Sequence, residues 1–275
     1  MVLDLELHDV HVLVTGSASG GIGLETVELF LEQGAKVTAH YNSNSDSLHP
    51  LASRYPSKQL LFTQAELTSE SAVESIFDSA QDHFDLPVQV LVVNHGIWPS
   101  QDTSIWEMEL EQWNRTIDVN LTASFLVTKH FLRCLSKHEL GDDVKRHVNI
   151  IFVGSTAGRF GEKGHSDYAA SKSALMYGLT LTLKNEIVKI APRGRVNCVA
   201  PGWVRTPLAE EALRDPNVVY RALATTPLKK IATTFDTAMQ IVLLASAKVS
   251  GHVTGQIVDV NGGMEGRLLN NAEDI

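Results

Sequence analysis

Short apolar runs alternate with longer amphipathic segments along the whole chain, and this alternation restricts the possible folds more than any other feature. Each apolar run has the length of a buried strand, and each longer segment has the apolar spacing of a helix. Strands that alternate with helices predict an α/β fold: a parallel, doubly wound sheet of about seven strands with helices on both faces. No linker or internal repeat interrupts the pattern, so we expect a single domain over residues 1–275.

The apolar pattern and its flanking glycines and prolines set the expected boundaries. The segment 201–230 contains several prolines and no clear period, so we expect irregular structure with two short helices there. The expected strands are 10–15, 36–40, 60–63, 88–93, 148–153, 195–199 and 256–260. The expected helices are 22–33, 69–84, one or two within 107–137, 167–190 and 235–247.

Composition argues against several classes of function. Hydrophobic residues make up 44% of the chain and charged residues 20%, as in a globular protein with a sizeable core. The formal net charge of −9 argues against nucleic acid and against an anionic membrane surface as partners. No apolar run approaches the ~18 residues of a membrane span, and the first residues carry acids where a secretory signal would be basic and then apolar. We therefore expect a cytoplasmic protein with no metal, nucleic-acid or membrane partner.

A glycine-rich turn joins the first expected strand to the first expected helix. It reads Thr-Gly-Ser-Ala-Ser-Gly-Gly-Ile-Gly over residues 15–23. Glycines let the backbone turn tightly and approach a pyrophosphate, which the positive end of the following helix stabilises. Ligands of open parallel sheets bind outside the carboxyl ends of the strands, so this turn should meet residues 94–96, 155 and 201–206, which follow other strands. The sequence therefore predicts a dinucleotide site at this edge of the sheet.

A tyrosine and a lysine are spaced for proton transfer. Tyr168 and Lys172 lie one turn apart on the same face of a helix. A free phenol has a pKa of about 10, and a neighbouring ammonium favours the phenolate. Tyr168 is thus a candidate general acid/base, and the Ser155 hydroxyl is a candidate to hold a substrate oxygen beside it. The Tyr-x-x-x-Lys spacing is common on exposed helices, so the assignment depends on the rest of the chain.

These segments together resemble the short-chain dehydrogenase/reductase family over nearly the whole chain. The nucleotide motif of that family is Thr-Gly-x-x-x-Gly-x-Gly, and this chain has one residue more. We align Gly21 and Gly23 with the last two glycines, which leaves Gly20 as the additional residue, because Gly-Ile-Gly leads directly into the helix. The other alignment matches Gly20 but places Ile22 where a glycine belongs.

The resemblance also implies roles for residues. Asn120 matches the helix asparagine that holds a water between the lysine and solvent, and Lys172 would bind the nicotinamide ribose. His95, within a segment that resembles the Asn-Asn-Ala-Gly motif, is expected to pack rather than to react. The expected catalytic residues are Asn120, Ser155, Tyr168 and Lys172. The expected cofactor-binding residues are Gly16, Ser17, Ser19, Gly21, Ile22, Gly23, His40, Tyr41, Asn42, Ser43, Glu66, Leu67, Asn94, Gly96, Tyr168, Lys172, Pro201, Gly202, Val204 and Thr206.

The end of the second strand bears on which nicotinamide cofactor is bound. NAD sites usually place an acid there to bind the ribose hydroxyls, but this segment has no acid before Asp46. No Arg or Lys is present there or in the glycine turn, although NADP sites commonly use one. On balance we expect NADP(H) rather than NAD(H). The side chains that could donate hydrogen bonds to a 2′-phosphate are His40, Asn42, Ser43 and Asn44.

These features predict an oxidoreductase that transfers a hydride between the nicotinamide and a small-molecule carbonyl or secondary alcohol, in particular an NADPH-dependent ketone or aldehyde reductase. We expect segment 201–232 to cover the substrate as a lid. The candidate pocket residues are Trp98, Phe160, His165 and Trp203. Their mix of aromatic and polar groups does not select a substrate.

Other functions on the same fold stay open. A non-catalytic dinucleotide sensor is the alternative from another class, although such a protein should have lost its Tyr, Lys or Ser. Enoyl reductases of this type often space Tyr and Lys more widely, and the epimerases are usually longer. The resemblance further implies a homodimer or homotetramer, with the long helices around 107–137 and 167–190 pairing across subunits.

Overall fold

One parallel sheet organises the molecule. The structure, a computed structural model, describes residues 4–137 and 140–266. Its strands are β1 (His11–Val14), β2 (Lys36–Tyr41), β3 (Leu60–Gln64), β4 (Val90–Val93), β5 (Asn149–Val153), β6 (Arg195–Pro201) and β7 (Ile257–Val260). All neighbouring strands pair in parallel, in the order β3-β2-β1-β4-β5-β6-β7. The strand order reverses direction between β1 and β4, which is where ligands bind in doubly wound sheets.

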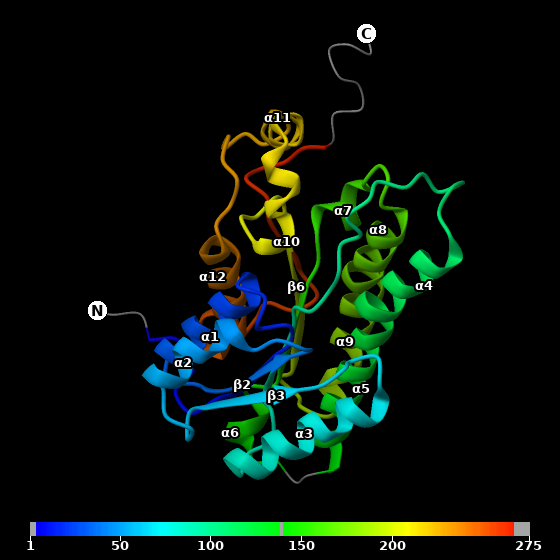
Figure 1. The fold of residues 1–275 in the computed structure, drawn as a ribbon. Helices are drawn as coiled ribbons and strands as arrows, with labels where there is room; N and C mark the ends of the chain where they lie inside the picture. Colours follow the sequence, from blue (N-terminus) through cyan, green and yellow to red (C-terminus); the bar gives the residue numbers. More distant parts are fainter. Residues whose placement is uncertain (1–3, 138–139, 267–275) are drawn as a thin grey trace.

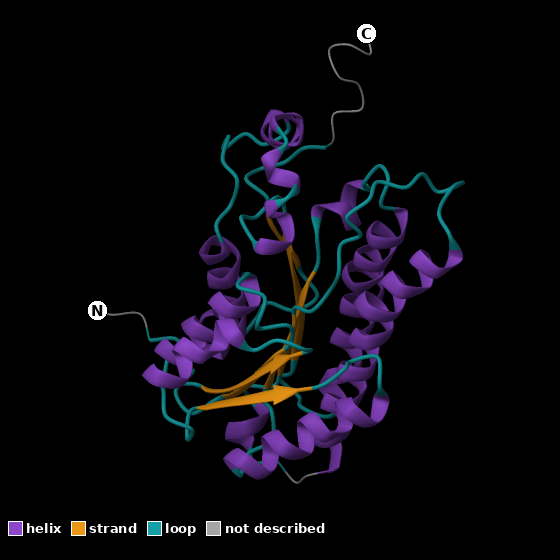
Figure 2. Ribbon diagram, in the orientation of Figure 1, coloured by secondary structure: helices purple, strands orange, loops and turns teal. Residues whose placement is uncertain are grey.

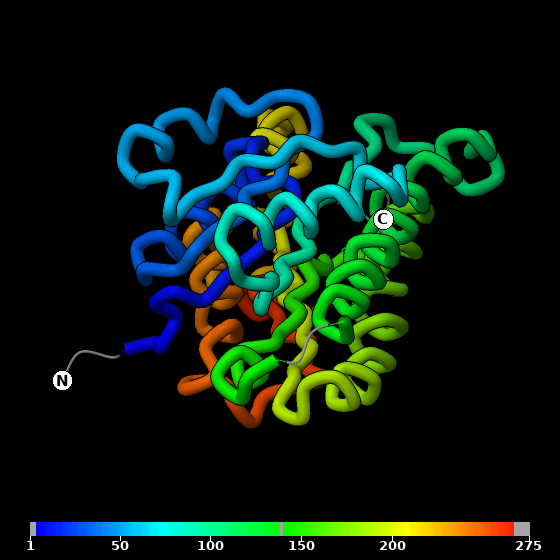
Figure 3. Tube along the Cα trace, turned by 90° about the horizontal axis from the view of Figure 1, so that it is seen from below, coloured from blue at the N-terminus to red at the C-terminus, as the bar shows by residue number. Residues whose placement is uncertain are grey.

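Helices cover both faces of the sheet (Figures 1 and 2). They are α1 (Ile22–Glu32), α2 (His49–Arg54), α3 (Glu70–Phe84), α4 (Leu110–Ile117), α5 (Ala123–Lys137), α6 (Asp142–Lys145), α7 (Thr156–Phe160), α8 (Ser166–Ser173), α9 (Thr180–Glu186), α10 (Pro207–Glu210), α11 (Pro216–Ala224), α12 (Thr234–Ala245) and α13 (Ala247–Ser250). Helices α1 and α12 pack together on one face, while α3, α5 and α9 cover the other (Figure 3). None of the helices in the described residues is both long enough and apolar enough to cross a bilayer.

The core consists of two apolar layers, one on each face of the sheet. Side chains alternate between them along each strand: Leu13 belongs to the layer under α3 and α5, whereas Val12 and Val14 belong to the layer under α1 and α12. In β5, Ile150 and Ile151 show the same alternation. Because a strand changes face at every residue, a continuous apolar run can serve both layers. This confirms the fold class that the sequence predicts.

The long helices contain irregular turns that the apolar pattern does not predict. The expected helix around 107–137 begins at Leu110 and passes through a π turn at Asp118–Thr122 before α5. The expected helix 167–190 passes through a second π turn at Ala174–Leu179 and ends in a 3₁₀ turn at Ile187–Lys189. Within 201–230 the structure has α10, α11 and a 3₁₀ turn at Ala212–Arg214. Another 3₁₀ turn, Asp46–Leu48, and the short helices α2, α6, α7 and α13 were not predicted, because each is too short to show a full apolar period.

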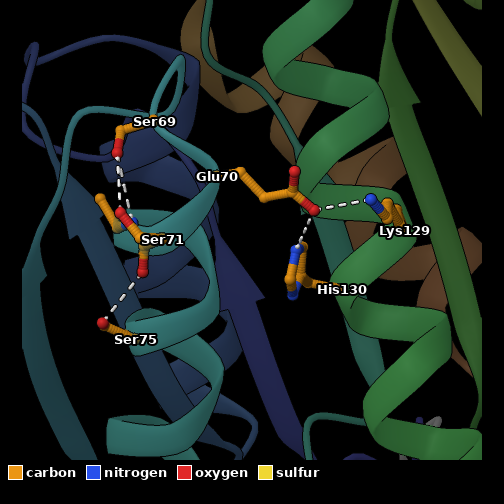
Figure 4. A network of polar contacts seen from close by, with 7 residues as sticks. Ser69, Glu70, Ser71, Ser75, Lys129 and His130 are labelled. Atoms are coloured by element: carbon orange, nitrogen blue, oxygen red, sulfur yellow. Dashed lines mark hydrogen bonds and ion pairs between the residues drawn. The ribbon is translucent and has the colours of Figure 1, made fainter.

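A polar cluster joins α3 to α5 outside the cavity (Figure 4). The Glu70 carboxylate accepts hydrogen bonds from Lys129 Nζ at 2.6 Å and from His130 Nε2 at 3.1 Å. The hydrogen bond from Lys129, and then that from His130, lowers the pKa of Glu70. Ser69, the residue before Glu70, caps α3 by accepting a hydrogen bond from Ala72 N. The contact links α3 and α5 at the surface, above their apolar packing, and no residue of the candidate site takes part in it.

Candidate active site

A cavity of about 490 Å³ lies at the carboxyl ends of the central strands. Its lining begins at the end of β2, crosses the glycine turn and the end of β4, and reaches the segments after β5 and β6. Segments far apart in the sequence are therefore brought together, as expected for ligand sites of open parallel sheets. Of the expected cofactor-binding residues, all except Ser17 and Gly23 line this cavity.

Asn94 holds the glycine turn in place. Its Nδ2 donates to the carbonyl oxygens of Thr15 and Gly16, both at 3.0 Å. A Cβ on Gly23 would lie 2.5 Å from Asn94 Nδ2 and 2.5 Å from Gly16 O, so no larger residue fits there. Gly20 has a φ of +69°, a conformation that favours glycine. The expected additional residue, Gly20, thus has a left-handed conformation and does not line the cavity, whereas Gly21 does.

His95 is part of the buried support of the turn. Its Nδ1 lies 2.8 Å from Thr15 Oγ1, and its Nε2 lies 3.4 Å from Ser124 Oγ. Burial lowers the pKa of His95 to about 3, so the ring is neutral at physiological pH. Thr15 Oγ1 also accepts hydrogen bonds from the backbone N–H groups of Asn94 and His95. These contacts give His95 the packing role that we expected.

The structure corrects the expected roles of His40 and Ser17. His40 lines the cavity, but its Nδ1 accepts from Gly16 N at 3.1 Å and its Nε2 donates to Ala65 O at 3.0 Å. With both ring nitrogens engaged, this side chain has no free donor for a phosphate. Ser17 is fully buried and its hydroxyl donates to Val14 O at 2.7 Å. Both residues therefore stabilise the backbone of the turn and its neighbouring strands and do not present a donor to a ligand.

Ser155 lies between β5 and α7, at the N-cap of α7. Its hydroxyl caps this short helix by accepting a hydrogen bond from Ala157 N at 3.1 Å. It also forms a side-chain hydrogen bond with Tyr168, which on its own lowers the pKa of the phenol. The cap fixes the Ser155 rotamer, so the hydroxyl is held beside the phenol before any substrate arrives.

Tyr168 and Lys172 face the cavity from α8, with Lys172 Nζ 5.6 Å from the centre of the Tyr168 ring. Tyr168 is half-buried at the cavity wall, and desolvation in this position raises the pKa of the phenol to about 12. We expected Lys172 to lower that pKa; instead, burial outweighs the other influences on the phenol. Burial also lowers the pKa of Lys172 to about 8, and its Nζ donates to Val153 O at 2.9 Å. At neutral pH the phenol is therefore protonated and the lysine is mostly charged.

Asn120 is fully buried in the π turn between α4 and α5. Its side chain accepts from Ile97 N at 2.8 Å and donates to Ile97 O at 3.1 Å. It also donates to Ser171 Oγ at 3.2 Å, next to Lys172. Asn120 does not line the cavity itself, whereas its neighbours Val119 and Ala123 do. Its contacts tie the loop after β4 to α8, and π turns are frequent at such functional positions.

The four expected pocket residues divide into two pairs. Trp98 and Trp203 line the cavity, whereas Phe160 and His165 do not. His165 is buried behind Trp98, with its ring centre 3.9 Å from that of the indole. Leu208, Ala209 and Ala212 of the expected lid segment also line the cavity. Sequence reasoning missed other lining residues, because nothing in the local pattern distinguishes them from ordinary connecting residues: Ala18, Thr68, Ile97, Gly154, Thr156, Ala157 and Glu162.

The lining fits a dinucleotide. Helix α1 has eleven residues and begins at Ile22, and its N-cap residue, Gly21, makes no side-chain cap, so backbone N–H groups at its start are available to a pyrophosphate. Tyr41, Asn42 and Ser43 would lie at the adenosine ribose, and Glu66 and Leu67 at the adenine. Among the described residues that line the cavity, Lys172 is the only Lys or Arg, and it would meet the nicotinamide ribose. The described residues contain no group of three or more side chains suited to a metal ion.

Comparison with known proteins agrees with this geometry. The family model described as enoyl-(acyl carrier protein) reductase matches residues 16–265. A 3-oxoacyl-(acyl-carrier-protein) reductase of Synechocystis sp. is 32% identical over 255 residues, which cover 92% of this chain and 95% of the relative. The corresponding reductase of Thermotoga maritima is 34% identical over 255 residues, covering 92% and 96%.

A solved structure shows the same fold. A protein from Brucella melitensis, described as a short-chain dehydrogenase/reductase and glucose/ribitol dehydrogenase, has a TM-score of 0.82 at 29% identity. The match covers 95% of this chain and 98% of that structure. The chain therefore belongs to the short-chain dehydrogenase/reductase family of NAD(P)-dependent oxidoreductases.

Proposed function

We propose that the protein is an NADP(H)-dependent ketoreductase and that 3-oxoacyl thioesters are the first substrate class to test. The observation that carries the proposal is the Tyr168 phenol, hydrogen-bonded to Ser155 and lining the same cavity as the glycine turn. The substrate class is suggested by the names of the two relatives reported above, both of which are 3-oxoacyl-(acyl-carrier-protein) reductases.

Each residue has a separate task in the proposed reduction. When bound, the reduced nicotinamide supplies the hydride to the carbonyl carbon. The Ser155 hydroxyl and the Tyr168 hydroxyl hold the carbonyl oxygen, and Tyr168 gives its proton to that oxygen as it gains charge. The high pKa of Tyr168, about 12, keeps this proton in place at neutral pH. Lys172 can return a proton to the phenolate, since its pKa of about 8 lies below that of the phenol.

The preference for NADP(H) rests on the end of β2. Tyr41, Asn42 and Ser43 line the cavity there, and none of them carries a negative charge that would repel a 2′-phosphate. The side chains of Asn42 and Ser43 form no hydrogen bond with described residues, which leaves their donors available. Fluorescence titration with NADPH and NADH should give tighter binding of NADPH. Tighter binding of NADH would reverse the preference.

Two other functions make different predictions. Enoyl reduction is suggested by the description of the matching family model, but the spacing of four between Tyr168 and Lys172 favours a ketoreductase. A dinucleotide sensor would bind the cofactor without turnover, although this chain keeps Ser155, Tyr168 and Lys172.

A turnover assay separates these functions. NADPH oxidation is followed with 3-oxoacyl thioesters, simple ketones, aldehydes and 2-enoyl thioesters. The proposal predicts turnover of a ketone, with enoyl thioesters left unreduced. Reduction of the enoyl thioesters alone would favour the enoyl reductase, and tight cofactor binding with no turnover across the panel would favour the sensor.

We further propose that segment 201–232 acts as a lid and that the protein forms a homodimer or homotetramer. The lid segment reaches the cavity through Trp203, Leu208 and Ala212.

The oligomer is suggested by apolar side chains on α5 and on the helical run through α9 that are 37–49% exposed, as expected for a face covered by a second copy. They are Phe125, Tyr177, Leu181 and Val188. Light scattering should give a mass of two or four chains, and a monomer at micromolar concentration would contradict this.

A further inference from the structure

We propose that Asp102 and His165 form a positioning pair that holds the Trp98 indole against Tyr168 and thereby shapes the substrate side of the cavity. The expected change in KM rests on the proposed function. The contacts between Asp102, His165 and Trp98 do not, because the proposed reaction uses none of these residues.

The pair connects the surface to the interior. His165 Nε2 lies 2.9 Å from Asp102 Oδ1, with the His165 side chain 3% exposed and the Asp102 side chain 78% exposed. A carboxylate accepts hydrogen bonds, so Nε2 carries the donated proton. His165 Nδ1 is buried and has no hydrogen-bond partner among the described residues. The contact to Asp102 is therefore the polar interaction that orients this ring.

The His165 imidazole packs against the Trp98 indole outside the cavity. The ring centres of Trp98 and His165 are 3.9 Å apart, with the planes inclined by 37°. Trp98 also contacts Tyr168, whose ring centre is 4.7 Å away and inclined by 73°, an edge-to-face contact. Since Trp98 also lines the cavity, the position of its indole sets the space beside the reacting phenol.

The backbone reinforces the same contact. Thr103 N donates to Gly164 O at 2.9 Å, which joins the loop that carries Asp102 to the turn before α8. A Cβ on Gly164 would lie 2.9 Å from Asp102 Cβ, so the two segments approach closely. His165 is also the residue immediately before α8, three positions before Tyr168. The loop, the indole and the catalytic helix are thus held as one unit.

This arrangement predicts a specificity effect. Removal of the carboxylate leaves the imidazole free to turn and the indole unsupported. We expect Asp102→Ala to raise the KM for the ketone on the order of 10-fold, the effect of losing one hydrogen bond to a charged group. The change in kcat should be smaller, and the Kd for NADPH should be unchanged, because the cofactor half of the cavity is not in contact with the pair. Asp102→Asn keeps an acceptor for Nε2–H and should restore most of the loss.

The test is a double-mutant cycle with a spectroscopic readout. Tryptophan emission of the ligand-free protein is recorded for Asp102→Ala in the natural background and in a Trp98→Phe background. We expect an emission change in the first and none in the second, and the KM effect should likewise disappear in the second. Glu107→Gln, which removes another exposed carboxylate of the same loop, is the matched control and should change neither quantity.

Emission or KM effects of Asp102→Ala that persist unchanged without Trp98 would overturn the proposal. So would an Asp102→Ala protein with the emission and KM of the unaltered chain. The emission measurement needs no substrate. A protein that turns over no ketone but shows the Trp98-dependent emission change would therefore refute the proposed function and leave the positioning pair intact.

Discussion

The two halves of the cavity are built differently. The cofactor half consists of the glycine turn and the side chains that hydrogen-bond to it or to one another, and these side chains are largely buried. They are Thr15, His40, Asn94 and His95. In the substrate half, Leu208 lines the cavity and is 57% exposed, and Tyr220 and Leu228, elsewhere in the proposed lid segment 201–232, are 64% and 65% exposed. A dinucleotide has the same shape in every turnover, so its half can be fixed, whereas the substrate half carries the loops that differ between specificities. Changes in the first half should therefore affect stability and cofactor binding, and changes in the second should affect KM.

The largest effect is expected at the point where the two halves meet. Tyr168→Phe removes the proton donor and should lower kcat by at least ~100-fold, the scale of general acid catalysis. NADPH binding should be nearly unchanged, because the ring and its packing remain. Steady-state kinetics and a cofactor titration on the same preparation measure both quantities. Turnover within a few-fold of the natural chain would refute the assignment of Tyr168.

Thr15→Val tests how rigid the cofactor half is. The substitution removes the acceptor of two backbone N–H groups and the partner of His95 Nδ1, all in a buried site. We expect a loss of about 2–3 kcal/mol in the free energy of unfolding, from buried groups left without partners. Urea denaturation measures it. Thr63→Val in β3, whose hydroxyl bonds to no described residue, is the control and should cost less than ~1 kcal/mol.

Lys172→Met should make the protein more stable while it impairs catalysis. Burial lowers the pKa of Lys172 from 10.5 to about 8, so the folded state disfavours the charged form. The unfolded chain then binds more protons between these two values, and the stability of the natural protein rises with pH across that range. Below pH 8 the variant should be more stable by about 2 kcal/mol, after allowance for the lost hydrogen bond to Val153 O.

Thermal unfolding at several pH values tests this. The difference between Lys172→Met and the natural chain should shrink as the pH rises from 8 towards 10.5. A difference that is constant over this range, or a variant that is less stable at pH 7, would show that the buried charge is not the cause.

The smallest effect is expected in the substrate half. Leu208 is 57% exposed, so Leu208→Ala should change the free energy of unfolding by no more than ~0.5 kcal/mol. The KM for the ketone should change a few-fold because Leu208 lines the cavity, with the Kd for NADPH unaltered. A loss of stability as large as that of Thr15→Val would remove the distinction between the two halves.

The difference between the rigid cofactor half and the open substrate half also bears on how much of the structure the sequence could predict. Apolar runs of strand length and a glycine turn before a helix predict the sheet, and they bring most of the expected cofactor-binding residues to one cavity. The role of His40 could not be predicted, since a polar residue at a strand end looks the same whether it bonds to a ligand or to the backbone. The π turn at Asn120 was not predicted either, because one additional residue in a helical turn leaves the apolar pattern almost unchanged. The Asp102–His165 contact joins residues 63 positions apart, which no local pattern reveals.

The most direct test of the central claim follows the hydride itself. NADPH carrying deuterium at the transferable position of the nicotinamide is incubated with the protein and a 3-oxoacyl thioester, and the product is analysed by mass spectrometry. If the cavity is a ketoreductase site with Tyr168 as acid, the 3-hydroxyacyl product should carry one deuterium on its carbinol carbon. The Tyr168→Phe protein should form it at least ~100-fold more slowly. Tight NADPH binding without labelled alcohol from any ketone tested would contradict the account.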